Sequence, residues 1–96
     1  MLSPKHIVDI VAEQFGLTRA QLLGRRRLPH IVLARHIAML LCIEMLQASL
    51  PQVGEWFGRD HTTVLHARDA MGRKIAVDRK FAKQVEGLRR IIRAAA

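Results

Sequence analysis

One stretch of the sequence combines side chains that can contact a base edge with residues that start a helix. An aspartate such as Asp60 accepts hydrogen bonds from the free N–H groups of a first helical turn. The residues after it, His61, Thr62 and Thr63, can donate and accept hydrogen bonds, and a threonine methyl suits the methyl group of thymine. The stretch fits the exposed start of a DNA-recognition helix, and it equally fits a well-capped helix without a ligand. Its full sequence is Gly58-Arg59-Asp60-His61-Thr62-Thr63-Val64-Leu65-His66-Ala67.

A second candidate is the run of three arginines Arg25, Arg26 and Arg27, which shortly precedes Pro29. Proline disfavours a regular helix through this segment, so a basic loop is predicted here. Arginines in a loop can neutralise phosphates, and one of them can enter a minor groove. The alternative is a solvated run of charge.

The sequence gives little support for a catalytic site or a metal-binding site. His61 and His66 are five residues apart, whereas a zinc pair on one helix needs a separation of about three or four residues. No Ser-His-Asp arrangement and no glycine-rich phosphate loop is recognisable, so neither an enzyme nor a cofactor is predicted. The single cysteine, Cys42, excludes an internal disulfide and a cysteine-based zinc cage, and its apolar neighbours predict a core position.

The composition favours one small domain, residues 1–96, that binds a polyanion. Sixteen Lys and Arg against eight Asp and Glu give a net charge of +8. Such an excess points to nucleic acid, and less often to an anionic membrane surface. No apolar run is expected to approach the ~20 residues that span a bilayer, and the first residues lack a signal-peptide layout. A reducing cytoplasm is the expected compartment.

The elements that position these residues are all predicted to be helices. Capping signals at Ser3, Thr18, Ser49 and Asp60 each precede a segment with helical spacing of apolar residues. The predicted fold is all-α with five or six helices. The predicted segments run from 4 to 15, 18 to 23, 31 to 48, 49 to 57 and 61 to 77, with a sixth helix from 78. The segment 31–48 is apolar over much of its circumference and is predicted to be central.

The fourth and fifth segments have the layout of a helix-turn-helix. A short helix, a turn over Gly58–Asp60 and a longer helix with polar first residues follow one another. In such a motif the first residues of the second helix enter the major groove.

The run Gly58–Ala67 closely resembles the signature of the C-terminal DNA-binding domain of DnaA, the bacterial replication initiator. Three further segments resemble that family in the same order, so the similarity extends from roughly Ile7 to Ile75. They are Leu22-Leu23-Gly24-Arg25-Arg26-Arg27, Ala34-Arg35-His36-Ile37-Ala38-Met39 and Ser49-Leu50-Pro51-Gln52-Val53-Gly54. The resemblance implies a small all-α helix-turn-helix domain of the Trp-repressor and DnaA C-terminal kind, which binds a short asymmetric duplex site called the DnaA box.

The resemblance also implies a role for individual residues. The major groove would be lined by Asp60, His61, Thr62 and Thr63, with Arg59 on the approach to it. The basic loop of Arg25, Arg26 and Arg27 would place Arg27 in the neighbouring minor groove. The DNA backbone or flanking bases would be contacted by Arg35, His36, Leu50 and Pro51.

The sequence departs from the family pattern at four places. The family usually has two glycines before the arginine of the signature, whereas only Gly58 precedes Arg59 here, so the turn is one residue shorter. Leu28-Pro29 replaces residues that are commonly Ser or basic, His36 stands where Gln is common, and Ile43 where Lys is often found. The same kind of site is expected, with a weaker or altered preference for the DNA sequence.

The function expected from these observations is DnaA-box binding in replication initiation or its regulation, without ATPase activity in this chain. The expected protein is cytoplasmic, associated with the nucleoid, monomeric on double-stranded DNA, and a possible partner of a replication or regulatory protein. The alternative is a degenerate DnaA-like module that acts as a transcriptional regulator or a protein-interaction domain with weak or non-specific DNA binding. Membrane-surface binding through residues 79–93 is a third hypothesis, although a helix that completes a small core explains their pattern more simply.

Overall fold

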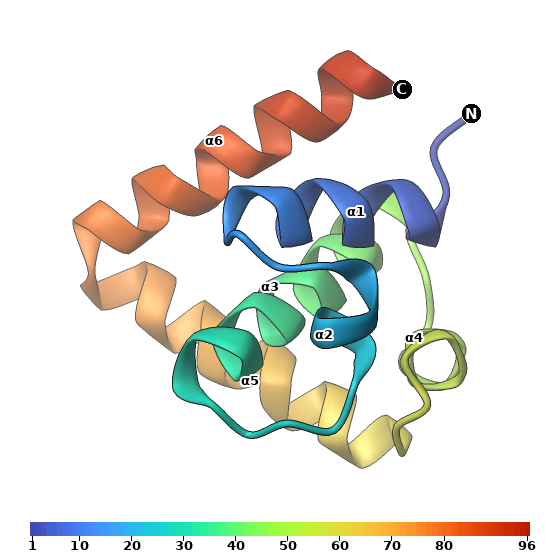
Figure 1. Cartoon of the computed structure of the whole chain (residues 1–96). Helices are drawn as coiled ribbons and strands as arrows, with labels where there is room; N and C mark the ends of the chain where they lie inside the picture. Colours follow the sequence, from blue (N-terminus) through green and yellow to red (C-terminus); the bar gives the residue numbers. More distant parts are fainter.

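A computed structural model of residues 1–96 consists of six α-helices and contains no strand (Figure 1). The helices are α1 (Pro4–Gln14), α2 (Arg19–Leu23), α3 (Pro29–Leu46), α4 (Leu50–Phe57), α5 (His61–Val77) and α6 (Arg79–Ala95). The all-α prediction is confirmed, with the sixth helix present.

Polar side chains at the predicted caps start four of the helices. Thr18 and Ser49 each accept from the backbone N–H three residues later, at 3.1 and 3.2 Å, and Gln21 and Gln52 return the bond to the cap residue. Ser3 forms the same reciprocal pair with His6. Because these bonds satisfy N–H groups that lack an intrahelical partner, they define where the helices begin.

The central helix α3 begins at Pro29 and ends at Leu46, whereas the sequence predicted 31–48. Proline fits the first helical turn because its missing N–H would have no partner there. At the other end, Gln47 adopts a left-handed conformation with φ of 51°, which stops the helix. The earlier start shortens the basic loop to residues 25–28.

Helix α3 packs against α1, α2, α4 and α5, which explains why apolar residues occur around most of its circumference. Ala34, Ile37, Ala38, Leu41 and Cys42 are completely buried. With 18 residues and a mean hydropathy of 1.5, α3 is long and apolar enough to cross a membrane by length and composition alone. The expectation that no apolar run approaches that length was therefore wrong, because a helix enclosed by four others needs an apolar surface like that of a membrane span.

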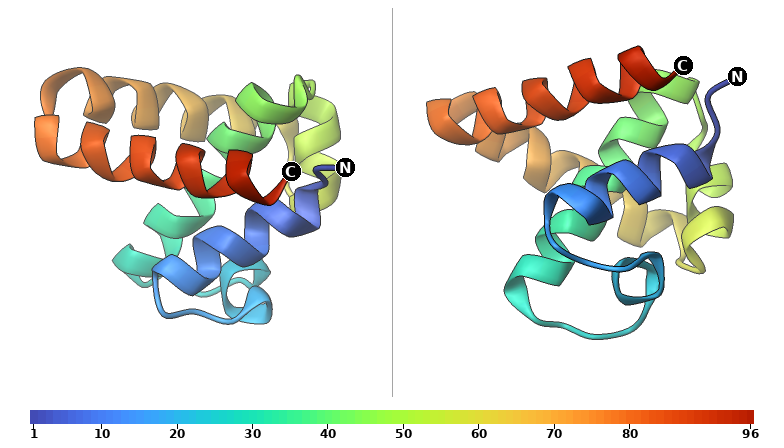
Figure 2. Two further views of the ribbon diagram at one scale, coloured as in Figure 1. Left: turned by 90° about the horizontal axis from the view of Figure 1, so that it is seen from above. Right: turned by 45° about the horizontal axis from the view of Figure 1, so that its top comes forward.

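Helix α6 turns back from the end of α5 and packs against both α5 and α1 (Figure 2). The predicted apolar stripe of α6 is buried, and it consists of Phe81, Val85, Leu88 and Ile92. Arg89 donates two hydrogen bonds to Glu44 of α3, at 2.9 and 3.0 Å. These contacts hold α6 against the other helices of the core.

Candidate nucleic-acid interface

The turn between α4 and α5 is closed by hydrogen bonds from two successive residues. Gly58 has a φ of 64°, which suits glycine, and its N–H donates to Glu55 O at 3.3 Å. The Arg59 N–H donates to Gly54 O at 2.8 Å, which completes a Schellman motif. A Cβ on Gly54 would lie 2.5 Å from Arg59 O, so no larger residue fits there without a backbone shift. A single glycine therefore suffices to close this shorter turn.

The first turn of α5 presents polar side chains to solvent. The Asp60 carboxylate accepts from the Thr62 N–H at 3.0 Å and lies 3.1 Å from Nδ1 of His61. The Thr62 bond is the main reason that the pKa of Asp60 lies below its usual value. His61, Thr62 and Thr63 are all exposed, as predicted for residues that contact a ligand. Their positions are fixed from behind by Val64 and Ala67, which are buried.

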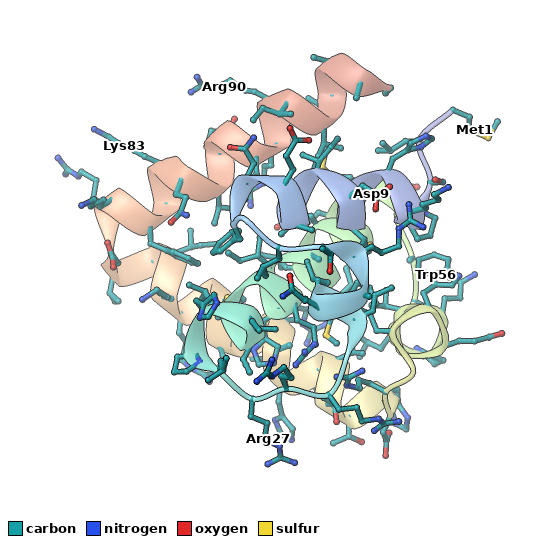
Figure 3. The ribbon with its side chains drawn as sticks, in the orientation of Figure 1. Met1, Asp9, Arg27, Trp56, Lys83 and Arg90 are labelled. Carbon is teal, nitrogen blue, oxygen red and sulfur yellow. The ribbon has the colours of Figure 1, made fainter.

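The basic loop extends from the end of α2 to the start of α3, and Arg25, Arg26 and Arg27 are all exposed. Arg27 points outward at the edge of the molecule, and Lys83 and Arg90 of α6 lie at the opposite edge (Figure 3). None of the three loop arginines forms an ion pair, because every ion pair in the structure involves other residues. Their charges are therefore available to an anionic ligand.

A cleft of about 300 Å³ joins the loop, α3 and the start of α5. It is lined by Arg25, Arg27, Val32, Arg35, His36, Met39, Arg59 and Thr63. None of these residues is acidic, so four arginines face one small volume without a compensating carboxylate. The structure thus brings together the basic loop and the recognition-helix residue Thr63, which are 36 residues apart in sequence.

The sequence predicted that Arg35 and Arg59 contact DNA, and it did not indicate the contacts that both guanidinium groups form with the protein backbone. Arg35 is buried, and its Nε donates to Leu22 O at 2.7 Å. Arg59 is half-buried, and its guanidinium donates to Leu23 O and Gly24 O at 3.2 and 2.6 Å. Burial lowers the pKa of both groups, and the charge of Arg59 further lowers the pKa of Arg35. In this structure both side chains bind the backbone of the protein itself.

His36 is half-buried in the cleft next to these arginines. Burial lowers the pKa of His36, and the charges of Arg35 and Arg59 lower it further. A phosphate in the cleft would counter both charges, which makes His36 sensitive to the presence of an anion.

Leu50 and Pro51 form the first turn of α4 and do not line the cleft. Another residue, His66, is exposed on α5, three and four positions after Thr63 and Thr62. Helical spacing places it on the same face of α5, so the i, i+4 rule could have added it to the candidates. The structure contains no cluster of three or more His, Cys, Asp or Glu residues that could hold a metal ion.

The comparisons with known proteins agree with this architecture. The family model described as the bacterial DnaA protein helix-turn-helix matches residues 4–70. The chain is 40% identical over 92 residues to the chromosomal replication initiator protein DnaA of Corynebacterium jeikeium, covering 95% of this chain and 16% of the relative. It is 39% identical over 94 residues to DnaA of Latilactobacillus sakei, covering 97% of this chain and 21% of the relative.

A third relative, DnaA of Lactobacillus helveticus, is 41% identical over 87 residues, which cover 90% of this chain and 19% of the relative. The chain thus spans about a fifth of the length of the relatives that it matches. The family match over residues 4–70 includes the basic loop, the turn between α4 and α5, and every residue that lines the cleft. The chain belongs to the bacterial DnaA helix-turn-helix family.

Proposed function

We propose that this protein binds double-stranded DNA at DnaA-box-like sites, in replication initiation or its regulation. The observation that carries the proposal is the cleft, where basic-loop arginines and the exposed start of α5 meet without an acidic residue. His61, Thr62 and Thr63 enter the major groove and contact base edges, and Asp60 orients the helix start and His61. Arg27 enters the adjacent minor groove, and Arg25 and Arg26 neutralise phosphates.

This arrangement lets one copy of the chain contact two neighbouring grooves of an asymmetric site. A helix-turn-helix alone commonly needs a dimer and a palindromic site to obtain enough contact. Here the basic loop supplies the second contact, so the protein binds as a monomer. The proposed site of action is the nucleoid in the bacterial cytoplasm, where the chain occupies DnaA-box-like sites.

The test is a titration of labelled duplexes followed by fluorescence anisotropy. One duplex carries a DnaA box and the other a scrambled box, each at low and near-physiological salt, because a chain of charge +8 binds any duplex at low salt. Tenfold or greater preference for the box at both salts supports the proposal, with a 1:1 complex by ultracentrifugation. Equal binding to both duplexes would reject it.

A second candidate function is a protein-interaction module with weak or non-specific DNA binding. It is favoured by an apolar groove of about 320 Å³ between α1, α2 and α4, beside the 39% exposed Trp56. Equal binding to both duplexes, together with a stable complex that Trp56→Ala abolishes, would favour this function.

A further inference from the structure

The backbone of the segment 22–26 is held by two arginine side chains from other parts of the chain. Arg35 of α3 donates through Nε to Leu22 O at 2.7 Å and through Nη2 to Arg26 O at 3.2 Å. Arg59, in the turn before α5, donates through Nη1 to Leu23 O and through Nη2 to Gly24 O. Four of the five carbonyls in this segment therefore bind a guanidinium.

The geometry also ties Arg59 to the helix-turn-helix itself. Its Nη1 donates to Phe57 O, at the end of α4, at 2.8 Å. One guanidinium thus bridges the C-terminal end of α2 and the C-terminal end of α4, where carbonyl groups lack intrahelical partners and a positive charge is favoured. Neither Arg35 nor Arg59 forms an ion pair with a carboxylate, so these carbonyls are their hydrogen-bond partners in the structure.

Few other bonds hold the basic loop. The Gly24 N–H donates to Gln21 O, and the Leu28 carbonyl accepts from the N–H groups of Ile31 and Val32. Between these two residues the loop backbone forms a single hydrogen bond, which Arg35 donates to Arg26 O. The side chains of Arg25, Arg26 and Arg27 are exposed and form no ion pair with the rest of the chain. The position of the loop relative to α5 therefore depends on the two guanidinium groups.

We propose that Arg59 and Arg35 are positioning residues, which lock the basic loop to the helix-turn-helix so that both grooves are contacted by one rigid unit. Arg59 acts on the minor-groove side of the site through the loop and does not contact a base. The inference rests on the proposed function for its DNA-binding part. Lysine cannot replace either arginine, because a single ammonium nitrogen cannot span two carbonyls with the planar geometry of a guanidinium.

The first test is a double-mutant cycle between Arg59→Lys and Arg27→Ala, measured as affinity for a panel of boxes that carry every single base-pair change. Positioning predicts that Arg59→Lys weakens box binding about fivefold or more and flattens the preference at the same base pairs as Arg27→Ala. It further predicts that the two losses do not add, as expected of residues that act as one unit. Arg19→Lys, whose side chain pairs with Asp9 outside the cleft, is the matched control.

The outcomes separate positioning from base contact. If Arg59 contacts a base, Arg59→Lys changes the preference at base pairs that Arg27→Ala leaves untouched, and the two losses add. That result overturns the inference while leaving the proposed function intact.

The second test needs no DNA, so it remains valid if box binding itself fails. Trypsin cleaves after arginine, and a loop freed from its anchors becomes a better substrate than the rest of the folded chain. Arg59→Lys and Arg35→Lys are each expected to speed cleavage after residues 25–27 about tenfold or more, with the other sites unchanged. Cleavage of the loop at the wild-type rate in both variants would overturn the inference, and a uniform increase at all sites, which indicates global unfolding, would also count against it.

Discussion

At the residue scale, the candidate interface divides into side chains that face solvent and side chains that bind the protein itself. His61, Thr62 and Thr63 are exposed at the start of α5, whereas Arg35 and Arg59 bind backbone carbonyls. Both kinds are polar and both belong to segments that resemble the DnaA family. We propose that only the exposed set contacts bases, so substitutions at the two sets should have different effects.

Thr63→Ala is expected to relax specificity without a large loss of non-specific affinity. A lost base contact costs about 1–3 kcal/mol of discrimination against the wrong base. Measured by anisotropy, the ratio of box to scrambled affinity falls while the slope of log K against log salt stays the same. Arg25→Ala is the contrasting control, because loss of a phosphate contact lowers that slope by about 1 and weakens both duplexes alike.

His36 is expected to make the stability of the free protein depend on pH. Its pKa in the folded state is lowered, mainly by burial, so the unfolded chain binds more protons below about pH 6.5, the ordinary pKa of histidine. The free energy of unfolding therefore decreases as the pH falls below that value and levels off below the folded-state pKa. Urea denaturation at a series of pH values should show a smaller decrease for His36→Gln.

His30→Gln, which changes an exposed histidine near the start of α3, controls for the loss of one titrating group. An unchanged pH dependence in His36→Gln would show that His36 is not the group responsible. The carboxylates with lowered pKa, such as Asp9 and Glu86, lose their stabilising effect only at lower pH, so their contribution is separated from that of histidine.

At the scale of elements, the helix-turn-helix depends on a close backbone approach inside α4. Gly54 lies three residues before Phe57, and a Cβ added to it would lie 2.5 Å from the carbonyl oxygen of Arg59. The same turn carries the hydrogen bond from Arg59 N–H to Gly54 O. The angle between α4 and α5 thus depends on the absence of a side chain at one position.

Gly54→Ala is expected to destabilise the protein by about 1–3 kcal/mol, the usual cost of forcing an extra group into a packed site. Thermal unfolding followed by circular dichroism measures the loss, and box affinity should fall as well because the turn moves. Gly72→Ala is the matched control, since a Cβ on Gly72, within α5, meets no atom within 4 Å. Alanine there should be neutral or slightly stabilising because it favours a helix over glycine.

At the scale of the whole molecule, basic side chains lie at opposite edges of the structure. Arg27 and the loop lie at one edge, and Lys83 and Arg90 of α6 lie at the opposite edge (Figure 3). The molecule measures 30 × 29 × 25 Å. Charges that far apart are screened from one another at physiological salt, where the Debye length is about 8 Å.

The double variant Lys83→Gln/Arg90→Gln is therefore expected to keep box affinity within about twofold of the wild type at physiological salt, despite the loss of two charges. Arg25→Gln/Arg27→Gln, which removes the same charge from the loop, should weaken binding strongly. Equal losses in the two variants would mean that net charge, and not the position of the charge, determines binding.

The burial of Cys42 leads to a prediction about the reactivity of its thiol, which does not involve DNA. Cys42 is completely buried in α3, and burial raises the pKa of its thiol to about 12. Since the thiolate is the reactive form, the folded protein should resist a thiol reagent such as dithionitrobenzoate at pH 8. In urea the thiol should react fully, so the labelling rate reports the population of unfolded protein. Rapid labelling under native conditions would contradict the packing of α3.

Much of the fold and the exposed half of the site could be predicted from the sequence, because the determinants are local. Caps such as Thr18 and Ser49 act within four residues, and the apolar period of α6 is a property of one helix. The turn after Phe57 was identified from one glycine, and the exposure of Thr62 and Thr63 followed from their place just after the Asp60 cap. The start of α3 was placed two residues late because a proline that disfavours a helix interior can begin one.

The contacts of Arg35 and Arg59 with backbone carbonyls are determined by tertiary structure alone. Arg59 and the carbonyl of Gly24 are separated by 35 positions, and nothing near either residue indicates that they meet. A charged side chain in a sequence looks the same whether it will face a phosphate or a carbonyl of its own chain. The packing of both α2 and α4 against α3 brings those carbonyls beside the guanidinium, and that packing depends on contacts between distant segments, which no local pattern encodes.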